Sequence, residues 1–166
     1  MQDAPEIQRL AEDRDIAATT SDGEIPEPGM AEQWIRMRQA RLRKGESFDF
    51  AIVHREQGVI IGTIGLGMEY KKDESMQLGY WLGKIYWNQG YCTEAAKAVL
   101  KYGFEVLELH RIFSRHFQRN QASARVLQKI GMKYEGTLRQ AFKKWGKFED
   151  IELYGILRSE YLALNR

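Results

Sequence analysis

Apolar side chains recur at helical spacing in four segments of the chain. In the last of these, Ala122, Val126 and Ile130 stack four residues apart, as they would on one buried helix face. Gly131 follows in the position where glycine commonly ends a helix. The predicted helices run from Ala4 to Ala18, Met30 to Lys44, Thr93 to Val106 and Ala122 to Ile130.

Runs of apolar and aromatic residues, several of them alternating with polar ones, predict strands between and after these helices. The predicted strands are Phe48 to Val53, Val59 to Leu66, Met76 to Leu82, Arg111 to Phe117, Tyr134 to Phe142 and Glu149 to Leu157. The connections carry turn residues or charges. They are the loop Thr19 to Gly29 and the turns His54 to Gly58, Glu69 to Ser75 and Trp145 to Lys147. This order predicts a mixed α/β layer fold in one domain, residues 1–166, without repeats.

Composition narrows the class of protein. Apolar residues make up 43% of the 166 residues, too many for a disordered chain. The net charge is only +2, which does not predict a nucleic-acid surface. The single cysteine, Cys92, excludes an internal disulfide and a cysteine-based zinc site. Because no segment has the length of a membrane span or the apolar core of a signal peptide, the sequence predicts a soluble cytoplasmic protein without a membrane partner.

The segment from Tyr86 to Ala95 joins a predicted strand to a predicted helix and carries Gly90 at the turn. The start of a helix leaves backbone N–H groups without partners and carries partial positive charge, so it can bind an anion. Glycine would let the backbone approach that anion closely. The alternative is an ordinary connection between a strand and a helix.

Two further features lie on either side of this turn. Gly79, inside the strand Leu78 to Leu82, predicts a bulge that frees backbone groups for an extended ligand, or else a tight spot under an aromatic ring. Asn120 precedes a short helix and can cap it, offer its amide to a ligand, or do both. A ligand with phosphates at one end and amides along an arm satisfies all three features. Coenzyme A thioesters have this shape.

The chain resembles the GNAT superfamily of N-acetyltransferases, and within it the RimJ and RimL branch that acetylates the N-termini of ribosomal proteins. The resemblance covers nearly the whole chain, and only the combination of motifs is specific. The similar stretches are Phe50 to Val53, Ile61 to Leu66, Leu78 to Leu82, Tyr86 to Ala95, Leu109 to Ile112, Asn120 to Gly131, Glu135 to Arg139 and Asp150 to Leu157.

The resemblance implies a twisted mixed sheet with helices on both faces. It implies transfer of an acetyl group from acetyl-CoA, without a metal, to a primary amine that attacks directly in a ternary complex. The amine is a protein N-terminus or a small molecule. In the implied site, the backbone of Tyr80, Trp81 and Leu82 binds pantetheine, and an N–H near Tyr80 polarises the thioester. Asn120 binds the same arm, and Ser123 lies near the thiol. The implied pyrophosphate loop consists of Asn88, Gln89, Gly90, Tyr91, Cys92 and Thr93.

The chain departs from the superfamily at several positions. Trp87 stands where relatives often have Gln or Arg, and Cys92 stands where they have Gly or Ala; we interpret Cys92 as a packing residue. Gln128 replaces the tyrosine that serves many relatives as general acid, which leaves Ser123 as the candidate. The first strand of the family is absent. It is lost, or it comes from outside this sequence or from another chain, and its absence would leave the Phe48 strand at an open edge.

The sequence does not identify the general base. The candidates are Glu69, Glu74, Glu94, Glu149, Asp150, His54, His110 and His116, and each has a plainer structural explanation. The final strands and the loop Thr19 to Gly29 are expected to frame the acceptor site, and an edge-paired homodimer is expected. Two other classes of protein remain: a non-catalytic acyl-CoA-binding regulator, and a plain interaction domain that does not bind CoA. A nucleotide-binding enzyme is disfavoured, because the loop lacks the P-loop lysine and the further glycines of a dinucleotide fingerprint.

Overall fold

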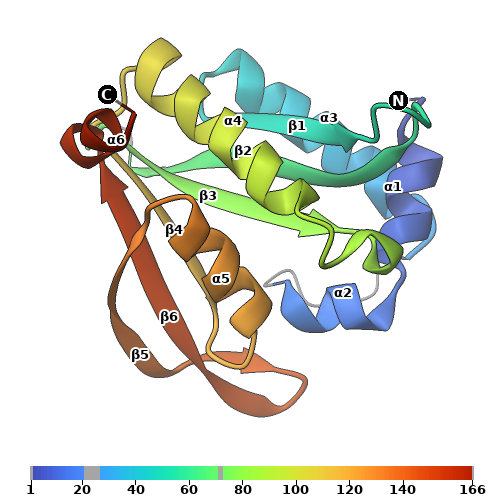
Figure 1. Cartoon of the computed structure of the whole chain (residues 1–166). Helices are drawn as coiled ribbons and strands as arrows, with labels where there is room; N and C mark the ends of the chain where they lie inside the picture. Colours follow the sequence, from blue (N-terminus) through green and yellow to red (C-terminus); the bar gives the residue numbers. More distant parts are fainter. Residues whose placement is uncertain (1, 21–26, 71–72, 166) are drawn as a thin grey trace.

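The computed structural model describes residues 2–20, 27–70 and 73–165 and contains one six-stranded sheet in the order β1-β2-β3-β4-β6-β5 (Figure 1). The strands are β1 (Ser47–Val53), β2 (Ile60–Tyr70), β3 (Ser75–Leu82), β4 (Arg111–Phe117), β5 (Lys133–Lys144) and β6 (Lys147–Leu157). Only the β3–β4 pair is parallel. The predicted mixed α/β fold is therefore confirmed.

Helices lie on both faces of this sheet, as predicted. They are α1 (Ala4–Ala11), α2 (Arg14–Thr19), α3 (Met30–Arg43), α4 (Tyr91–Lys101), α5 (Gln121–Lys129) and α6 (Arg158–Leu164). A 3₁₀ turn (Lys84–Tyr86) precedes α4, and a π-helical turn (Tyr102–Val106) continues it. In Figure 1, α4 and α5 lie in front of the sheet. No helix in the described ranges is long and apolar enough to cross a membrane.

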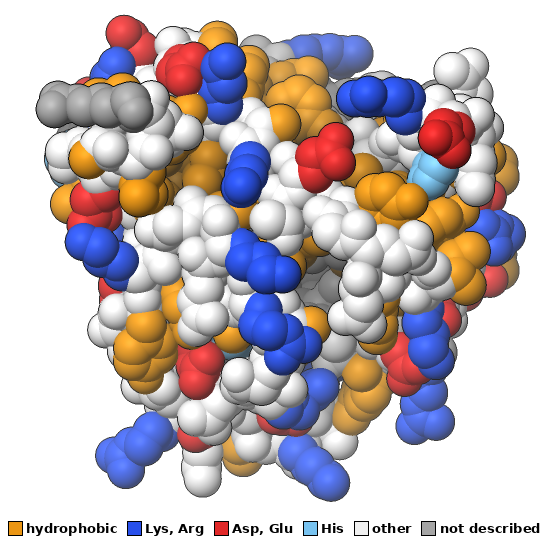
Figure 2. Space-filling model, in the orientation of Figure 1, with side chains coloured by type: hydrophobic (Ala, Val, Ile, Leu, Met, Phe, Trp, Pro, Cys, Tyr) orange, Lys and Arg blue, Asp and Glu red, His pale blue; other side chains and the backbone are white. Residues whose placement is uncertain are grey.

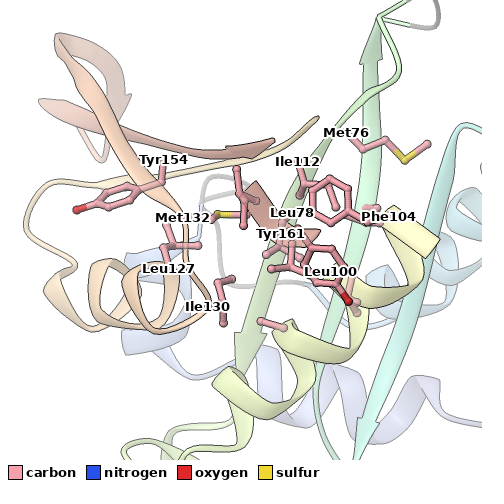
Figure 3. Close-up of a cluster of buried hydrophobic side chains, with 14 of the residues drawn as sticks. Met76, Leu78, Leu100, Phe104, Ile112, Leu127, Ile130, Met132, Tyr154 and Tyr161 are labelled. Carbon is pink, nitrogen blue, oxygen red and sulfur yellow. The ribbon is translucent and has the colours of Figure 1, made fainter. Parts of the chain in front are cut away.

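The main core lies between the sheet and the helices α4 and α5. Leu78 and Ile112, from β3 and β4, are fully buried, and they meet Leu100 from α4 and Leu127 from α5 (Figure 3). Burying one such side chain stabilises the fold by about 1.5–3 kcal/mol. Because both helices are packed against the same two strands, the start of α4 and the start of α5 are held in fixed positions.

The strands β3 and β4 separate soon after they begin. They pair at only three positions, from Ser75 with Arg111 to Gln77 with Phe113. The pairing of β3 with β2 continues to Leu82 and passes through Gly79 without a shift in register. The two strands therefore diverge beyond Gln77. The bulge predicted at Gly79 is wrong, because this glycine keeps an ordinary place in the ladder with β2, and the alternative of a tight spot is wrong as well, because a Cβ added there would meet no atom within 4 Å.

The structure departs from the predicted elements most clearly at two of them and adds one helix. The helix predicted from Ala4 to Ala18 is two helices, because Asp13 interrupts it and caps α2 by accepting a hydrogen bond from the Asp15 N–H at 2.8 Å. The strand predicted to end at Leu66 continues to Tyr70. Helix α6 was not predicted at all.

The remaining predicted segments can be placed only in part. Most of the loop Thr19 to Gly29, and part of the turn Glu69 to Ser75, lie outside the described residues. Within the described ranges, the strand β1 pairs only with β2 and forms an edge of the sheet, which is the position expected for the Phe48 strand.

Candidate active site

The backbone of Tyr80 lies beyond the last position at which β3 pairs with β4. Gly83 donates its N–H to the Ile61 carbonyl of β2 at 2.8 Å, and Ser114 on β4 donates its hydroxyl to the Leu78 carbonyl at 2.8 Å. Backbone groups in an antiparallel pair alternate between the two sides of the strand. The N–H and C=O of Tyr80 therefore point toward β4, at a place where the two strands no longer pair.

The other two residues that are predicted to bind pantetheine, Trp81 and Leu82, orient their backbone groups differently. Trp81 pairs with Thr63 in the β2 ladder, so its backbone points away from the gap. Leu82 points toward the gap, but its carbonyl accepts a hydrogen bond from the Trp87 indole at 2.8 Å. Of the three residues, Tyr80 alone presents both a donor and an acceptor to the gap.

The start of α4 matches the expectation for an anion site. Gly90 is the residue before the helix, with a φ of +87°, and Asn88 also has a positive φ, of +60°. No side chain caps this helix, and a Cβ added at Gly90 would meet no atom within 4 Å. The helix begins at Tyr91, two residues before the predicted start, and no side chain caps the N–H groups of its first turn.

Positive side chains line the exposed sides of α4 and α5. Figure 2 shows a line of Lys and Arg side chains on the face where α4 and α5 lie. The exposed cations of the two helices are Lys97, Lys101, Arg125 and Lys129. Their field favours an anionic ligand on this face, in addition to the helix dipole.

Asn120, Ser123 and Tyr80 form one hydrogen-bonded group. The Asn120 side chain accepts a hydrogen bond from the Ser123 N–H at 3.2 Å, so it caps α5 as predicted. The Tyr80 hydroxyl lies 2.8 Å from Ser123 Oγ and 3.3 Å from the Ser123 carbonyl. Burial raises the pKa of the Tyr80 hydroxyl, which therefore stays protonated at neutral pH. Sequence reasoning had assigned Tyr80 only a backbone role.

Cys92 lies in the first turn of α4, close to Tyr80. Burial raises the pKa of its thiol to about 12, so desolvation outweighs the effect of the helix dipole. This favours the packing interpretation of Cys92. At the same helix start, His54 Nε2 lies 2.9 Å from the Tyr91 hydroxyl, and both rings pack with Tyr86.

Most of the candidate bases are engaged elsewhere. His116 is buried against Tyr154, with its Nδ1 2.8 Å from the Phe117 carbonyl. Glu149 forms an ion pair with Arg119 at 3.0 Å. Of the remaining candidates, Asp150 accepts from the Gln140 N–H, His54 contacts Tyr91, Glu94 and His110 are exposed, and Glu74 lies at a turn. The Glu69 side chain lies outside the described residues.

The hairpin of β5 and β6 is tied to α2. Lys144 is buried and donates to the carbonyls of Ala17 at 2.6 Å and Thr20 at 2.7 Å. Arg119 donates to the Ala18 carbonyl at 2.7 Å. These contacts join the two regions that were expected to frame the acceptor site.

The profile of a protein family described as Acetyltransferase (GNAT) domain matches residues 1–133. The chain belongs to the GNAT acetyltransferases. It is 34% identical over 137 residues to the uncharacterized N-acetyltransferase YnaD of Bacillus subtilis, which covers 82% of this chain and 80% of the relative. The resemblance to acetyl-CoA-dependent N-acetyltransferases is thus confirmed.

Solved GNAT structures share the fold of this chain. Spermidine N-acetyltransferase from Vibrio cholerae, in complex with CoA and spermine, superimposes with a TM-score of 0.84 at 21% identity, covering 97% of this chain and 93% of that protein. RimL, a ribosomal alpha-N-protein acetyltransferase in complex with coenzyme A, gives a TM-score of 0.86 at 16% identity, covering 94% and 89%. At these identities the likeness concerns the fold.

The features of this chain fit acetyl-CoA. The uncapped start of α4 suits a pyrophosphate, the free Tyr80 backbone suits an amide of the pantetheine arm, and the gap between β3 and β4 lies between them. Among the described residues, no group of three or more His, Cys, Asp or Glu side chains could hold a metal ion.

Proposed function

We propose that the chain transfers the acetyl group of acetyl-CoA to a primary amine by direct attack, with both substrates bound at once. The observation that carries this proposal is the divergence of β3 and β4 after Gln77. It leaves the Tyr80 backbone facing a gap whose mouth is formed by the start of α4. A fully paired β3 and β4 would leave no place for the thioester.

The residues that bind the cofactor follow from this geometry and from the resemblance. The pyrophosphate lies on the first turn of α4 and its loop, which consist of Asn88, Gln89, Gly90, Tyr91, Cys92 and Thr93. The pantetheine arm pairs with the β3 segment Tyr80 to Leu82, chiefly through Tyr80, and reaches Asn120. The Asn120 carbonyl oxygen caps α5, so its NH₂ group is the part that binds the arm.

Two groups of this chain then act on the reaction. The Tyr80 N–H donates to the thioester oxygen as negative charge develops there, an effect typically worth about 3–4 kcal/mol. The Ser123 hydroxyl gives its proton to the leaving thiolate and receives one from the Tyr80 hydroxyl, which lies 2.8 Å away. The proton that the attacking nitrogen loses returns through solvent to Tyr80, so that both hydroxyls are restored. When bound, acetyl-CoA supplies the activated acetyl group.

The acceptor is a primary amine that enters from the side of α2 and the β5–β6 hairpin. Among the proteins that share this fold, one is named for spermidine and another for a ribosomal protein α-amine. Both acceptors remain open at this level. An edge-paired homodimer through β1 stays a prediction.

Binding is tested first, by the thermal shift that CoA produces, because a ligand of the folded state raises the melting temperature by mass action. We expect a shift with the wild type and none with Gly90→Leu, whose leucine side chain would occupy the proposed pyrophosphate site. Gly45→Leu is the matched control, since Gly45 also has a positive φ, of +68°, and open space at its Cβ. A normal shift with Gly90→Leu would show that the phosphates bind elsewhere.

Turnover is tested by thiol release from acetyl-CoA with a panel of peptides and amines. Thiol release with at least one amine would support the proposed acetyltransferase activity. A thermal shift with CoA but no release with any amine would instead indicate a non-catalytic acyl-CoA-binding regulator. If CoA produced no thermal shift and no amine caused thiol release, the chain would be an interaction domain that does not bind CoA.

A further inference from the structure

One row of residues crosses the sheet beside the gap between β3 and β4. The row consists of Gly79 on β3, Arg115 on β4, Leu153 on β6 and Gly136 on β5. Leu153 pairs with Arg115 on one side and with Gly136 on the other. Gly79 and Arg115 face each other across the gap, because each lies two positions beyond the last pair of β3 with β4.

This row lies on the face of the sheet opposite α4 and α5. Successive side chains of a strand point to opposite faces. Leu78 and Ile112 are buried with residues of those two helices. Gly79 and Arg115 lie an odd number of positions from them on the same strands and therefore belong to the other face, which is turned away from the viewer in Figure 1.

The row is open next to the gap. Gly79 and Arg115 are both exposed. A Cβ added at Gly79 or at Gly136 would meet no atom within 4 Å. There is thus room for a ligand beside the Tyr80 backbone. Long side chains on a sheet reach neighbours about 7–8 Å away, so the Arg115 guanidinium comes within reach of a molecule that lies over Gly79.

Arg115 gives the row a positive charge, since the other three residues are uncharged. Glu135 also lies on this face, over Gly155, but Arg111 neutralises its carboxylate through two hydrogen bonds. A guanidinium binds a carboxylate with two parallel hydrogen bonds, whereas it repels an ammonium group. The row therefore favours an acceptor with a carboxylate over one that carries only ammonium groups.

We propose that Arg115 binds a carboxylate of the acceptor, and that the acceptor is a primary amine with this carboxylate a few bonds from its nitrogen. This inference rests on the proposed function. Because the cofactor occupies the side of α4, the amine reaches the thioester from the face that carries Arg115. A carboxylate bound to Arg115 leaves the amine over Gly79, next to the Tyr80 backbone. Free amino acids have this arrangement, and so do peptides that begin with an acidic residue.

The test measures kcat/KM by thiol release with matched pairs of acceptors. One pair is free alanine and alaninamide. The other is a tripeptide amide that begins with aspartate and the same peptide with asparagine first. The pair whose carboxylate form is preferred shows whether the carboxylate belongs to a free amino acid or to an acidic peptide. Spermidine serves as the acceptor without a carboxylate.

The deciding quantity is the change of this preference in Arg115→Gln. We expect the preference for the carboxylate form to fall about tenfold or more, the equivalent of about 1.4 kcal/mol, while the KM of acetyl-CoA stays the same. Arg115→Lys keeps the charge but not the paired donors, and should retain part of the preference. The control is Arg43→Gln, at an exposed position in the last turn of α3.

Two results would overturn the proposal while the CoA thermal shift stays normal. One is the same preference in Arg115→Gln as in the wild type, and the other is a wild type that uses spermidine more efficiently than every acceptor with a carboxylate. If Arg115→Gln does not fold, Gly79→Val decides, because its side chain enters the open space of the row. An unchanged acceptor KM there would also overturn the proposal. Absence of a CoA shift in the wild type, or of release with any amine, would instead refute the proposed function itself.

Discussion

The hydroxyl of Tyr80 lies 2.8 Å from the hydroxyl of Ser123 and so connects β3 to α5 across the gap between β3 and β4. The two residues are 43 positions apart in the sequence. Many relatives supply a tyrosine hydroxyl from the position that Gln128 occupies here. In this chain Gln128 instead donates to the Tyr154 hydroxyl at 3.4 Å, and Tyr80 brings a hydroxyl to the gap from the opposite side.

This pair predicts a strong effect of Ser123→Ala on turnover. Loss of a general acid typically lowers kcat by about 10²–10⁴-fold, and we expect the lower end because water can substitute in part. Tyr80→Phe should lower kcat less, by about tenfold, since Ser123 remains but loses its proton donor. Thiol release at saturating acetyl-CoA and amine gives kcat directly.

The double variant tests whether the two hydroxyls act as a unit. If they do, Ser123→Ala with Tyr80→Phe should be no slower than Ser123→Ala alone, because the effects of a coupled pair do not add. Effects that multiply would show that the hydroxyls act separately. A wild-type kcat in Ser123→Ala would remove Ser123 from the mechanism.

The raised pKa of Cys92 predicts slow alkylation. With a thiol pKa of about 12 instead of the ordinary 9.0, only about one molecule in ten thousand carries the thiolate at pH 8. The rate with iodoacetamide should therefore rise about tenfold per pH unit from pH 7 to pH 10, without a plateau. The urea-unfolded protein is the control and should level off near pH 9. A plateau near pH 8 in the folded protein would mean that the helix dipole outweighs burial.

The fold was predictable where it depends on the periodicity of apolar residues. Strand β4 has the predicted limits, Arg111–Phe117, because its inward residues alternate along one buried strand. The break before α2 was not predictable in this way, since Asp13 fits equally well on the polar side of a continuous helix. Helix α6 is short and follows β6 without a loop. Its start depends on Glu160, which accepts the Leu157 N–H at 3.0 Å.

The candidate site was predictable in its local features but not in the contacts that depend on tertiary packing. The roles of Gly90 and Asn120 are local, because a positive φ and a helix cap depend on neighbouring residues, and both were predicted. The contact of Tyr80 with Ser123 and the position of Arg115 across the gap from Gly79 depend on how strands and helices pack. In the sequence, Arg115 is only a charged residue within a predicted strand, which is typical of a solvent-facing position. This explains why it was not among the candidate residues.

The ion pair between Arg111 and Glu135 predicts a pH-dependent stability. Arg111 donates two hydrogen bonds to Glu135, at 2.6 and 2.5 Å, and these hold the pKa of the Glu135 carboxyl below its usual 4.5. The contribution is therefore present above the ordinary pKa and lost as the pH falls through the lowered value. Because both side chains are about one-third exposed, solvent screening limits it to about 0.5–1 kcal/mol.

Urea unfolding of Glu135→Gln checks this. The variant should be less stable than the wild type at pH 7, and the difference should shrink as the pH falls below 4.5 and through the lowered pKa of the Glu135 carboxyl. Glu56→Gln, at an exposed turn, is the control and should not change stability at any of these pH values. A difference that does not shrink with falling pH would mean that Glu135 acts through packing rather than charge.

The buried amine of Lys144 predicts a link between the β5–β6 hairpin and acceptor binding. Lys144 donates to the Ala17 and Thr20 carbonyls at the end of α2 and lies over the Trp145 ring at 5.0 Å. Lys144→Met keeps the apolar stem but leaves these carbonyls without their donor, so we expect a loss of stability of about 1–3 kcal/mol.

If α2 borders the acceptor site, the same variant should also raise the acceptor KM several-fold. The thermal shift by CoA should stay unchanged, because Lys144 bonds the end of α2, whereas the turn before α4 is tied to the start of α2 through Lys84 and Asp15. Lys143→Met is the matched control, since the exposed Lys143 lies over Phe148 on the same hairpin. A loss of stability without a change in acceptor KM would show that Lys144 supports the fold alone. The amine would then have to enter along a path that α2 does not border.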